Sequence, residues 1–256
     1  MSKNNNNISI SGGYRTEDEK LEASLNKKCF DANPNTWEIK MENFPKYIKR
    51  QNLTRFLALY EIFKLVINVK GSIVECGVNH GFGTMAWSKF SSIIEPVNLT
   101  RKIYGFDTFE GFPSLSKNDK SSYTKKVKVG DLASSSMEEI LKLSAIHDKT
   151  RFLGHIPKIE LIKGDAIKTI PKFVADNPHI LVSLLFLDFD LYKPTKVALE
   201  EFVPKMTKGA VIAFDELDNP LWPGETQAML EECGAQNLKI QRLEFDPYIG
   251  FAVIGE

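Results

Sequence analysis

The chain has 256 residues, of which 43% are hydrophobic, and this suits one domain with an extension and an ample apolar core. Its 33 basic and 33 acidic residues balance, which argues against nucleic acid or an anionic membrane surface as a partner. No apolar run reaches the roughly 18 residues of a membrane span, the polar start lacks a signal-peptide core, and three scattered cysteines suit a reduced compartment, so we expect a cytoplasmic protein.

The first 50 residues differ from the rest and are predicted to form a separate arm or lid. Residues 1–28 are polar and lack periodicity, so we expect them to be flexible. In residues 30–47 aromatic residues alternate with charges and prolines, which favours packing on the domain or on a neighbouring subunit. We therefore expect a homo-oligomer, a dimer or larger. Residues 51–256 are predicted to form the main domain, which opens with a helix at about residues 53–67.

A short strand at residues 72–77 runs into a glycine-rich turn and then into a helix from about Thr84 to Phe90. This order is typical of a nucleotide-binding half-domain, because glycines let the backbone approach a ligand and the helix N-terminus offers free N–H groups. Asn79 stands where a dinucleotide-binding fold has its middle glycine, which argues against NAD. The predicted cofactor-binding residues of this stretch are Glu75, Gly77, Asn79, Gly81, Gly83 and Thr84.

The next predicted strand, at residues 102–106, ends at Asp107. An acid at the end of the second strand can accept hydrogen bonds from both ribose hydroxyls, and the alternative is that it caps a local turn. Thr108 and Phe109 follow in a loop over the same edge of the sheet. We expect all three residues to contact the cofactor.

A Ser- and Lys-rich segment at residues 114–136 is predicted to be a surface excursion that can become ordered over substrate. The third strand, at residues 158–163, ends at Gly164 and Asp165. Both are predicted cofactor-binding residues. Asp165 is placed either to meet an adenine edge or to cap the helix that follows at residues 167–174.

The most informative stretch is an apolar run from about Ile180 that ends in Asp188 and Asp190. Its composition is typical of a strand buried on both faces of a parallel sheet. Side chains alternate along a strand, so the two acids are expected on one face if the strand extends that far. Ligands of open α/β sheets bind beyond the carboxyl ends of the strands, so the pair indicates a cation or proton-transfer site. The alternative is that one acid caps the next helix, which is expected to begin at Pro194.

A second buried strand, at residues 210–214, also ends in acids, Asp215 and Glu216. Neighbouring strands lie about 4.8 Å apart, so four carboxyl groups are expected to converge. Such a cluster is costly unless a cation neutralises it, and oxygen ligands without His or Cys favour Mg²⁺, Ca²⁺ or Mn²⁺ over Zn²⁺. Residues 238–245 and 248–254 then predict an antiparallel hairpin.

Four motifs of the chain together resemble the macrocin-type (tylosin-pathway) family of sugar O-methyltransferases. They are Glu75-x-Gly77 with its glycine turn, the segment from Gly105 to Pro113, the block from Asp188 to Thr195, and the strand end Phe214-Asp215-Glu216. The resemblance covers about residue 53 to the C-terminus, and the Asp-x-Asp block is its most specific part. It implies a class I methyltransferase fold, which is α/β and Rossmann-like. Such a fold has a seven-stranded, mostly parallel sheet with helices on both faces and a C-terminal antiparallel hairpin.

The resemblance also implies S-adenosylmethionine as methyl donor, Mg²⁺, and methylation of a hydroxyl of a deoxysugar. The sugar is either nucleotide-linked or attached to a natural product or glycan. By this pattern Asp188, Asp215 and Glu216 hold the metal, Asp188 also borders the cofactor, and Asp190 is the general base. Glu216 departs from the second Asp expected at its position, and the Trp222–Thr226 loop differs from the macrolide members.

The chemistry supports this interpretation, because a bound divalent ion stabilises a developing alkoxide and an adjacent carboxylate can take the proton. Two alternatives stay open. A metal-dependent glycosyltransferase also uses Asp-x-Asp to hold a nucleotide-sugar, although the glycine turn and Asp107 fit it less well. A non-catalytic cofactor-binding protein would need the fold without the acids.

Overall fold

The computed structural model describes residues 16–121 and 127–256. The chain divides into two compact units, Met1–Phe56 and Leu57–Glu256. The described part of the first unit is helical, with α1 (Glu17–Ala32), α2 (Trp37–Glu42), the 3₁₀ turn η1 (Phe44–Lys46) and the start of α3 (Arg50–Leu65).

Glu17 to Lys28 have regular structure in α1, which the lack of periodicity did not predict, whereas residues 1–15 are outside the described residues. That the arm is flexible stays a prediction. Alpha-helical propensity explains the helix, because α1 is rich in Glu, Lys, Leu and Ala. An ion pair between Lys27 and Asp31, one helical turn apart, adds to it.

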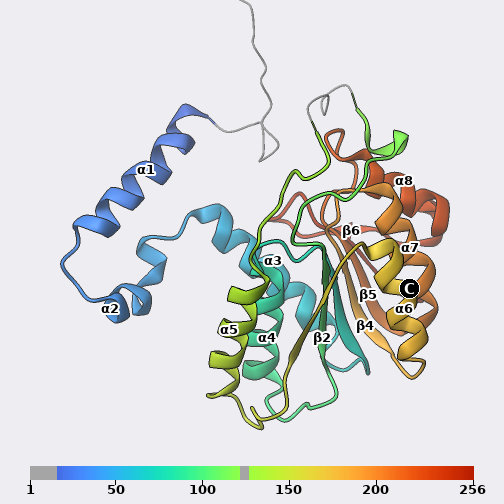
Figure 1. Cartoon of the computed structure of the whole chain (residues 1–256), viewed down its shortest axis with the longest axis horizontal. Coiled ribbons are helices and arrows are strands. Elements are labelled where there is room, and N and C mark those ends of the chain that lie inside the picture. Colours follow the sequence, from blue (N-terminus) through green and yellow to red (C-terminus); the bar gives the residue numbers. More distant parts are fainter. Residues whose placement is uncertain (1–15, 122–126) are drawn as a thin grey trace, which may run out of the picture. The chain divides into compact units, whose positions relative to one another are not determined.

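Among the described residues, the Leu57–Glu256 unit contains a seven-stranded sheet with helices on both faces (Figure 1). The strands are β1 (Ser72–Cys76), β2 (Ile103–Asp107), β3 (Ile159–Lys163), β4 (Val182–Leu187), β5 (Met206–Phe214), β6 (Gln241–Arg242) and β7 (Gly250–Val253). The remaining helices and turns are α4 (Phe82–Ile94), η2 (Lys117–Asp119), α5 (Met137–Asp148), α6 (Ala166–Asp176), α7 (Tyr192–Phe202), η3 (Val203–Lys205), α8 (Pro223–Glu232) and η4 (Ala235–Asn237).

The strand order is β3-β2-β1-β4-β5-β7-β6. The first five strands are parallel, β7 runs antiparallel to β5, and β6 runs antiparallel to β7. This confirms the predicted mostly parallel sheet with an antiparallel C-terminal pair. The order reverses between β1 and β4, and in open α/β sheets ligands bind beside this switch point, at the carboxyl ends of the strands.

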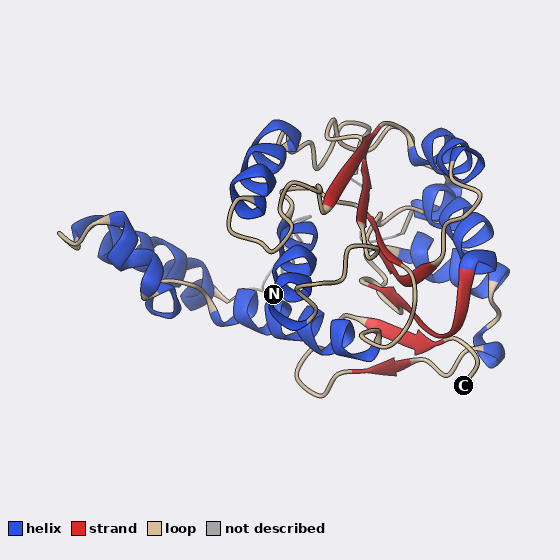
Figure 2. Ribbon diagram, turned by 90° about the horizontal axis from the view of Figure 1, so that it is seen from below, coloured by secondary structure: helices blue, strands red, loops and turns tan. Residues whose placement is uncertain are grey.

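The helices form two layers around the sheet (Figures 1 and 2). The C-terminal part of α3 lies with α4 and α5 on one face, and α6, α7 and α8 lie on the other. Trp87 of α4 packs against Phe186 of β4 with ring centroids 5.7 Å apart, and Phe173 of α6 packs against Phe106 of β2 at 5.3 Å. All six residues of β4 are buried, as its unbroken apolar run predicts.

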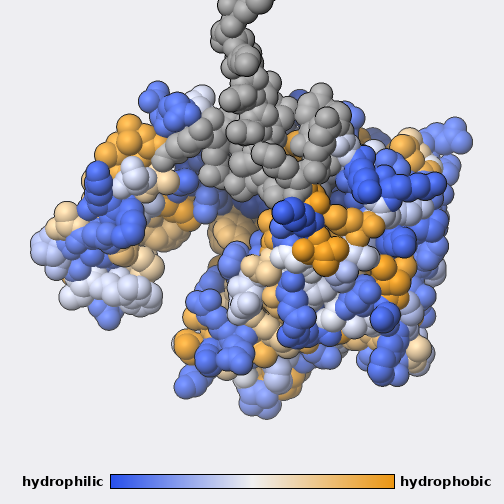
Figure 3. Space-filling model, turned by 45° about the horizontal axis from the view of Figure 1, so that its top comes forward, coloured by the Kyte–Doolittle hydropathy of each residue, from blue (hydrophilic) through white to orange (hydrophobic). Residues whose placement is uncertain are grey.

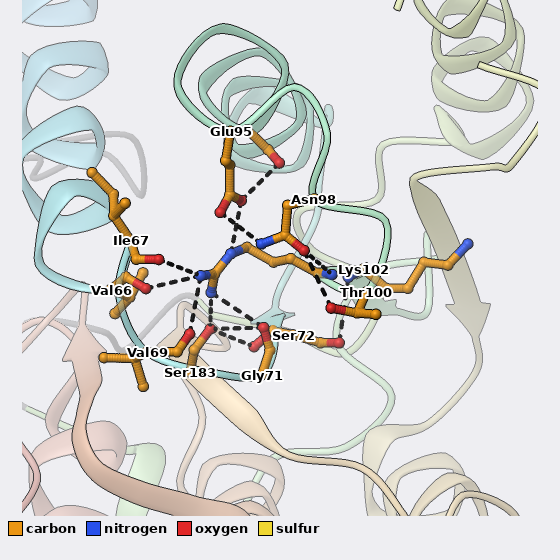
Figure 4. A network of polar contacts seen from close by, with 12 residues as sticks. Val66, Ile67, Val69, Gly71, Ser72, Glu95, Asn98, Thr100, Lys102 and Ser183 are labelled. Carbon is orange, nitrogen blue, oxygen red and sulfur yellow. Dashed lines mark hydrogen bonds and ion pairs between the residues drawn. The ribbon is translucent and has the colours of Figure 1, made fainter. Parts of the chain in front are cut away.

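Arg101, just before β2, joins several elements at the amino ends of the strands. Its partners, among them Val66, Glu95 and Ser183, are labelled in Figure 4. Its guanidinium group is buried and forms an ion pair with Glu95 at 2.7 Å. It also donates hydrogen bonds to the hydroxyl of Ser183 at 2.5 Å and to four backbone carbonyl groups. These carbonyls belong to Val66, Ile67, Val69 and Gly71. Arg101 therefore closes the segment after α3 against the edge of the sheet opposite the strands' carboxyl ends.

The face of the molecule in Figure 3 is mostly hydrophilic, with smaller apolar areas between the polar ones. Exposed apolar side chains in the second unit include Ile146 and Phe152. No helix in residues 16–121 or 127–256 combines the length and the apolar character that crossing a membrane requires.

Candidate active site

The glycine turn after β1 lies directly against the end of β4. The Asp188 N–H donates to the Cys76 carbonyl at 2.7 Å, and the Gly77 N–H donates to the Phe106 carbonyl at 2.9 Å. Gly77 has a φ of 101°, and a Cβ there would overlap the carbonyl oxygen of Asp188. Because only glycine fits this close approach, the ends of β1, β2 and β4 meet at the switch point of the sheet.

Asp107 holds the glycine turn in place. Its Oδ2 accepts hydrogen bonds from the backbone N–H groups of Val78 and Asn79, both at 2.8 Å, and its Oδ1 accepts from the Phe109 N–H at 2.6 Å. A carboxylate has about four acceptor positions, so about one is left for a ribose hydroxyl. The turn-capping role is present, and the ribose contact stays a prediction.

Glu75 belongs to β1, and its carboxyl group lies against the first turn of α4. It is 2% exposed, it accepts a hydrogen bond from the Thr84 hydroxyl, and a Cβ on Gly83 would overlap its Oε1. The positive end of the helix stabilises a carboxylate at this position. Asn79 and Gly81 complete the turn in left-handed backbone, with φ of 47° and 81°, and the Asn79 side chain is exposed.

Two serines at the C-terminal end of the Ser-rich 114–136 segment, which the sequence did not single out, form hydrogen bonds with this turn. The hydroxyl of Ser134 donates to the Asn79 carbonyl at 3.0 Å, and the buried Ser136 hydroxyl donates to the same oxygen. This end of the segment is therefore tied to the glycine turn. Serine content alone carried no sign of it, because the partner lies 55 residues away from Ser134.

Thr108 and Phe109 support the loop after β2. The Thr108 hydroxyl donates to the Gly111 carbonyl at 2.6 Å. The Phe109 ring is 3% exposed and packs with Val78 and Ile140 in a small apolar cluster. The ring is thus core packing behind the glycine turn, and a contact of Phe109 with the cofactor stays a prediction.

The end of β3 lies next to the end of β2, since the Gly164 N–H donates to the Asp107 carbonyl at 2.9 Å. Asp165 is the N-cap of α6, and its Oδ1 accepts from the Ile167 N–H at 3.1 Å. The structure therefore shows Asp165 as a helix cap, and its contact with an adenine edge stays a prediction.

The acids after β4 lie in a turn and not on a strand. β4 ends at Leu187, and Asp190 has left-handed backbone with a φ of 61°. The shared face was expected only if the strand extended to both acids; this condition is not met, because β4 ends before Asp188 and a left-handed residue breaks the strand pleat. α7 begins at Tyr192, two residues before the expected Pro194.

Asp190, Asp215 and Glu216 nevertheless form one electrostatic group. Burial, followed by repulsion from Glu216 and Asp215, raises the pKa of Asp190 well above its ordinary value. A carboxylate in such surroundings holds a proton more readily than an exposed one and is a better base. The Asp215 N–H donates to the Leu187 carbonyl at 2.9 Å, which joins the ends of β4 and β5.

Glu225, in the first turn of α8, is a fourth acid of this group and was missed in the sequence. It is 0% exposed, and its Oε1 accepts a hydrogen bond from the Glu216 N–H at 2.9 Å. Its Oε2 is buried, and no donor in the described ranges reaches it. Burial, then repulsion from Asp215 and Asp190, raises the pKa of Glu225, and the hydrogen bond from Glu216 opposes this. An acid in the first turn of a helix that begins with proline is common, so the sequence around Glu225 carried no signal.

The 3₁₀ turn η2 and the residues before it are also fixed at this edge of the sheet. Asp119 is 5% exposed; its Oδ1 accepts from the Tyr192 N–H at 2.6 Å and its Oδ2 from the Ser116 N–H at 2.5 Å. Phe112 packs against Trp222 with ring centroids 5.7 Å apart. This part of the 114–136 segment is therefore anchored between α7 and the loop before α8.

Within the described residues, no three His, Cys, Asp or Glu side chains form a group with the spacing of a metal site. Asp188, Asp215 and Glu216 are thus not drawn together as a closed ligand set. The donor chemistry still fits a hard cation, because only carboxylates are involved. The buried, donor-free Oε2 of Glu225 is the kind of atom that a cation would compensate. The metal stays a prediction.

A family model described as a methyltransferase domain matches residues 74–217. The chain therefore belongs to the methyltransferase family, and its sheet is that of the class I, S-adenosylmethionine-dependent members. The glycosyltransferase alternative does not agree with this family.

Among solved structures, the chain is similar to CalS11, described as a calicheamicin methyltransferase. The identity is 32% over 95% of each chain, with a TM-score of 0.90. An apo structure of CalS11, described as a TDP-rhamnose 3'-O-methyltransferase in calicheamicin biosynthesis, matches with 31% identity over 95% of this chain and 97% of that one, at a TM-score of 0.81. The O-methyltransferase NovP shares the fold at 19% identity over 78% of this chain and 79% of that one, at a TM-score of 0.57. A comparison with curated proteins finds no significant match.

Proposed function

We propose that this methyltransferase transfers a methyl group from S-adenosylmethionine to a hydroxyl of a nucleotide-linked deoxysugar. The observation that carries the proposal is the similarity, over nearly the whole of both chains, to an enzyme described as a TDP-rhamnose 3'-O-methyltransferase. The resemblance of the Asp188–Thr195 block to the macrocin-type sugar O-methyltransferases supports the same acceptor class.

In this proposal the Gly77–Gly83 turn and Asp107 bind the methyl donor. S-adenosylmethionine, when bound, supplies an electrophilic methyl group on its sulfonium. Asp107 uses its remaining acceptor position for a ribose hydroxyl, a charge-assisted hydrogen bond worth about 1.5–3 kcal/mol. The glycine backbone allows the cofactor to lie close to the end of β1.

Asp190 is proposed to take the proton of the acceptor hydroxyl. Its burial beside Glu216 and Asp215 supports this role, since both features favour the protonated product of the step. Asp188, Asp215 and Glu216 are proposed to hold a divalent cation, which when bound stabilises negative charge on the sugar oxygen. The anchored Phe112–Asp119 loop then orients the sugar, and orientation supplies much of the rate in such transfers.

A methyl-transfer assay with S-adenosylmethionine tests the acceptor class. Its panel contains TDP-deoxysugars, UDP-sugars, free sugars and glycosides, each with Mg²⁺ or with EDTA. We expect a methylated TDP-deoxysugar, loss of turnover with EDTA and recovery with Mg²⁺. Full activity after exhaustive chelation contradicts the metal. Methylation of glycosides alone contradicts the nucleotide-linked acceptor, and cofactor binding without transfer to any sugar indicates a non-catalytic protein.

Two variants separate the base from a metal ligand. Asp190→Asn keeps the shape but cannot take the proton, so only the chemical step should slow, by roughly 10²–10⁴-fold. Asp188→Asn should instead lose cation affinity and recover in part with excess Mg²⁺. The measurement is the transfer rate of each variant across a Mg²⁺ titration. Equal rescue of both variants makes Asp190 an ordinary ligand.

A further inference from the structure

We infer that Glu225 is a positioning residue of the acidic site. With one carboxyl oxygen it fixes the backbone of Glu216, and with the other it adds negative charge that strengthens the binding of a divalent cation. The inference rests on the metal in the proposed function. It adds to the metal ligands that follow β4 and β5 a supporting residue from α8.

The two oxygens of the Glu225 carboxyl group have different surroundings. Oε1 accepts the Glu216 N–H at 2.9 Å, so Glu225 holds the backbone directly after the acid Asp215. Oε2 is buried without a donor among the described residues. A buried acceptor without a partner costs about 1–3 kcal/mol, and more when it is charged, so an ionised Glu225 is costly without a compensating charge. A cation beside it would remove that cost.

The start of α8 leaves Glu225 little freedom to turn toward solvent. The preceding residue, Gly224, is buried, and a Cβ on it would lie 2.5 Å from both the Asp119 Oδ1 and the Tyr192 N. Helix α8 therefore begins in tight contact with the start of α7 and with the η2 loop. This packing holds the Glu225 carboxyl group among the other acids, whose charges act on it.

A proton on Oε2 would also satisfy this atom, and Glu225 would then be a neutral structural acid. Glu225→Gln distinguishes the two cases. Its amide oxygen can still accept the Glu216 N–H, and its NH₂ group replaces Oε2 without charge. A neutral structural acid can be replaced in this way without changing cation affinity, whereas a carboxylate that serves the cation cannot.

The experiment measures Mn²⁺ and Mg²⁺ binding by calorimetry and the Mg²⁺-induced rise in melting temperature. It compares the wild type, Glu225→Gln, Glu225→Met and the control Glu232→Gln, which removes one charge at the other end of the same helix, where Glu232 pairs with Lys196. For Glu225→Gln we expect cation affinity to fall about 10-fold or more, as for residues that support metal ligands, while affinity for S-adenosylhomocysteine stays within about twofold. The control should bind cations like the wild type.

Unchanged cation affinity in Glu225→Gln, with normal binding by the wild type, overturns this inference and leaves the proposed function intact. No cation binding by the wild type overturns the metal in the proposed function and this inference with it. If the Gln variant does not fold, Glu225→Met gives the same comparison without a polar group, and unchanged affinity there is equally contradictory.

Discussion

Replacing Arg101 should destabilise the fold without weakening the cofactor site. Arg101→Met leaves Glu95, whose side chain is 9% exposed, without its cation, and removes five hydrogen bonds that Arg101 donates. The Val66 and Gly71 carbonyls keep other donors, the Val69 N–H and the Ser183 hydroxyl. Breaking a buried ion pair costs about 3–5 kcal/mol. We expect the lower end, about 3 kcal/mol, because Glu95 still accepts hydrogen bonds from Ser91 and Asn98.

The assay is urea and thermal unfolding of both Arg101→Met and a matched control, Arg242→Met, which removes an exposed arginine from β6. The control should stay within about 0.5 kcal/mol of the wild type. Arg101→Lys should recover little, because one ammonium group cannot replace a planar fork that reaches carbonyls on both sides. For a domain of this size, 3 kcal/mol lowers the melting temperature by roughly 6–12 °C.

Binding of S-adenosylhomocysteine, measured well below the melting temperature, should be unchanged in Arg101→Met. The reason is that Ser183 and Gly71 lie at the amino ends of β4 and β1, away from the glycine turn. A loss below about 1 kcal/mol would refute the energetic reasoning. If a folded Arg101→Met protein bound the cofactor more weakly, the claim that contacts at the amino ends of the strands do not affect the cofactor site would be refuted.

Three further predictions concern single positions. Gly77→Ala should unfold the site or abolish cofactor binding, because the new Cβ would overlap the Asp188 carbonyl. Gly130→Ala is the control for backbone strain, since Gly130 has a φ of 87° and open space around it. Equal effects of the two variants would contradict the clash. Asp107→Ala should weaken S-adenosylhomocysteine binding in calorimetry, since the turn loses its acceptor, and unchanged affinity would remove Asp107 from the site. Burial lowers the pKa of Lys158 to about 8, so the unfolded chain binds more protons than the folded one above that pH. The stability of the wild type relative to Lys158→Met should therefore rise between about pH 8 and 10, by up to about 2 kcal/mol, and a flat difference in unfolding free energy would contradict it.

Much of the site followed from local patterns in the sequence. Buried strands carry unbroken apolar runs, and the strand and helix periodicities differ, so the order of the βα units could be predicted. Parallel strands bring their carboxyl ends to one edge, which predicted that the glycine turn and the acids after two strands lie at the same edge of the sheet. The hydrogen bond between the ends of β1 and β4 agrees with this expectation.

Local patterns could not settle the segments whose conformation depends on neighbours. The sequence left open whether β4 extends to Asp190, and the strand ends at Leu187, where its pairing with β1 and β5 also ends. The Ser-rich segment was expected to be a surface excursion, and most of its described residues are exposed or partly exposed; what the sequence did not indicate is that Asp119 and Ser136 are buried and fasten it to the start of α7 and to the glycine turn.

The sequence by itself determined the order of the strands and helices, the glycine turn and the acids at two strand ends, because each depends on residues close together in the chain. Only the tertiary structure decided the roles of Arg101 and Glu225. Arg101 bonds to carbonyl groups of the segment after α3, more than 30 residues before it. Glu225 is buried because α8 packs at the end of β5, and neither residue type nor spacing distinguishes it from a glutamate in the first turn of an exposed helix. Burial and charge compensation depend on what surrounds a side chain in space, and that is settled only when distant segments pack together.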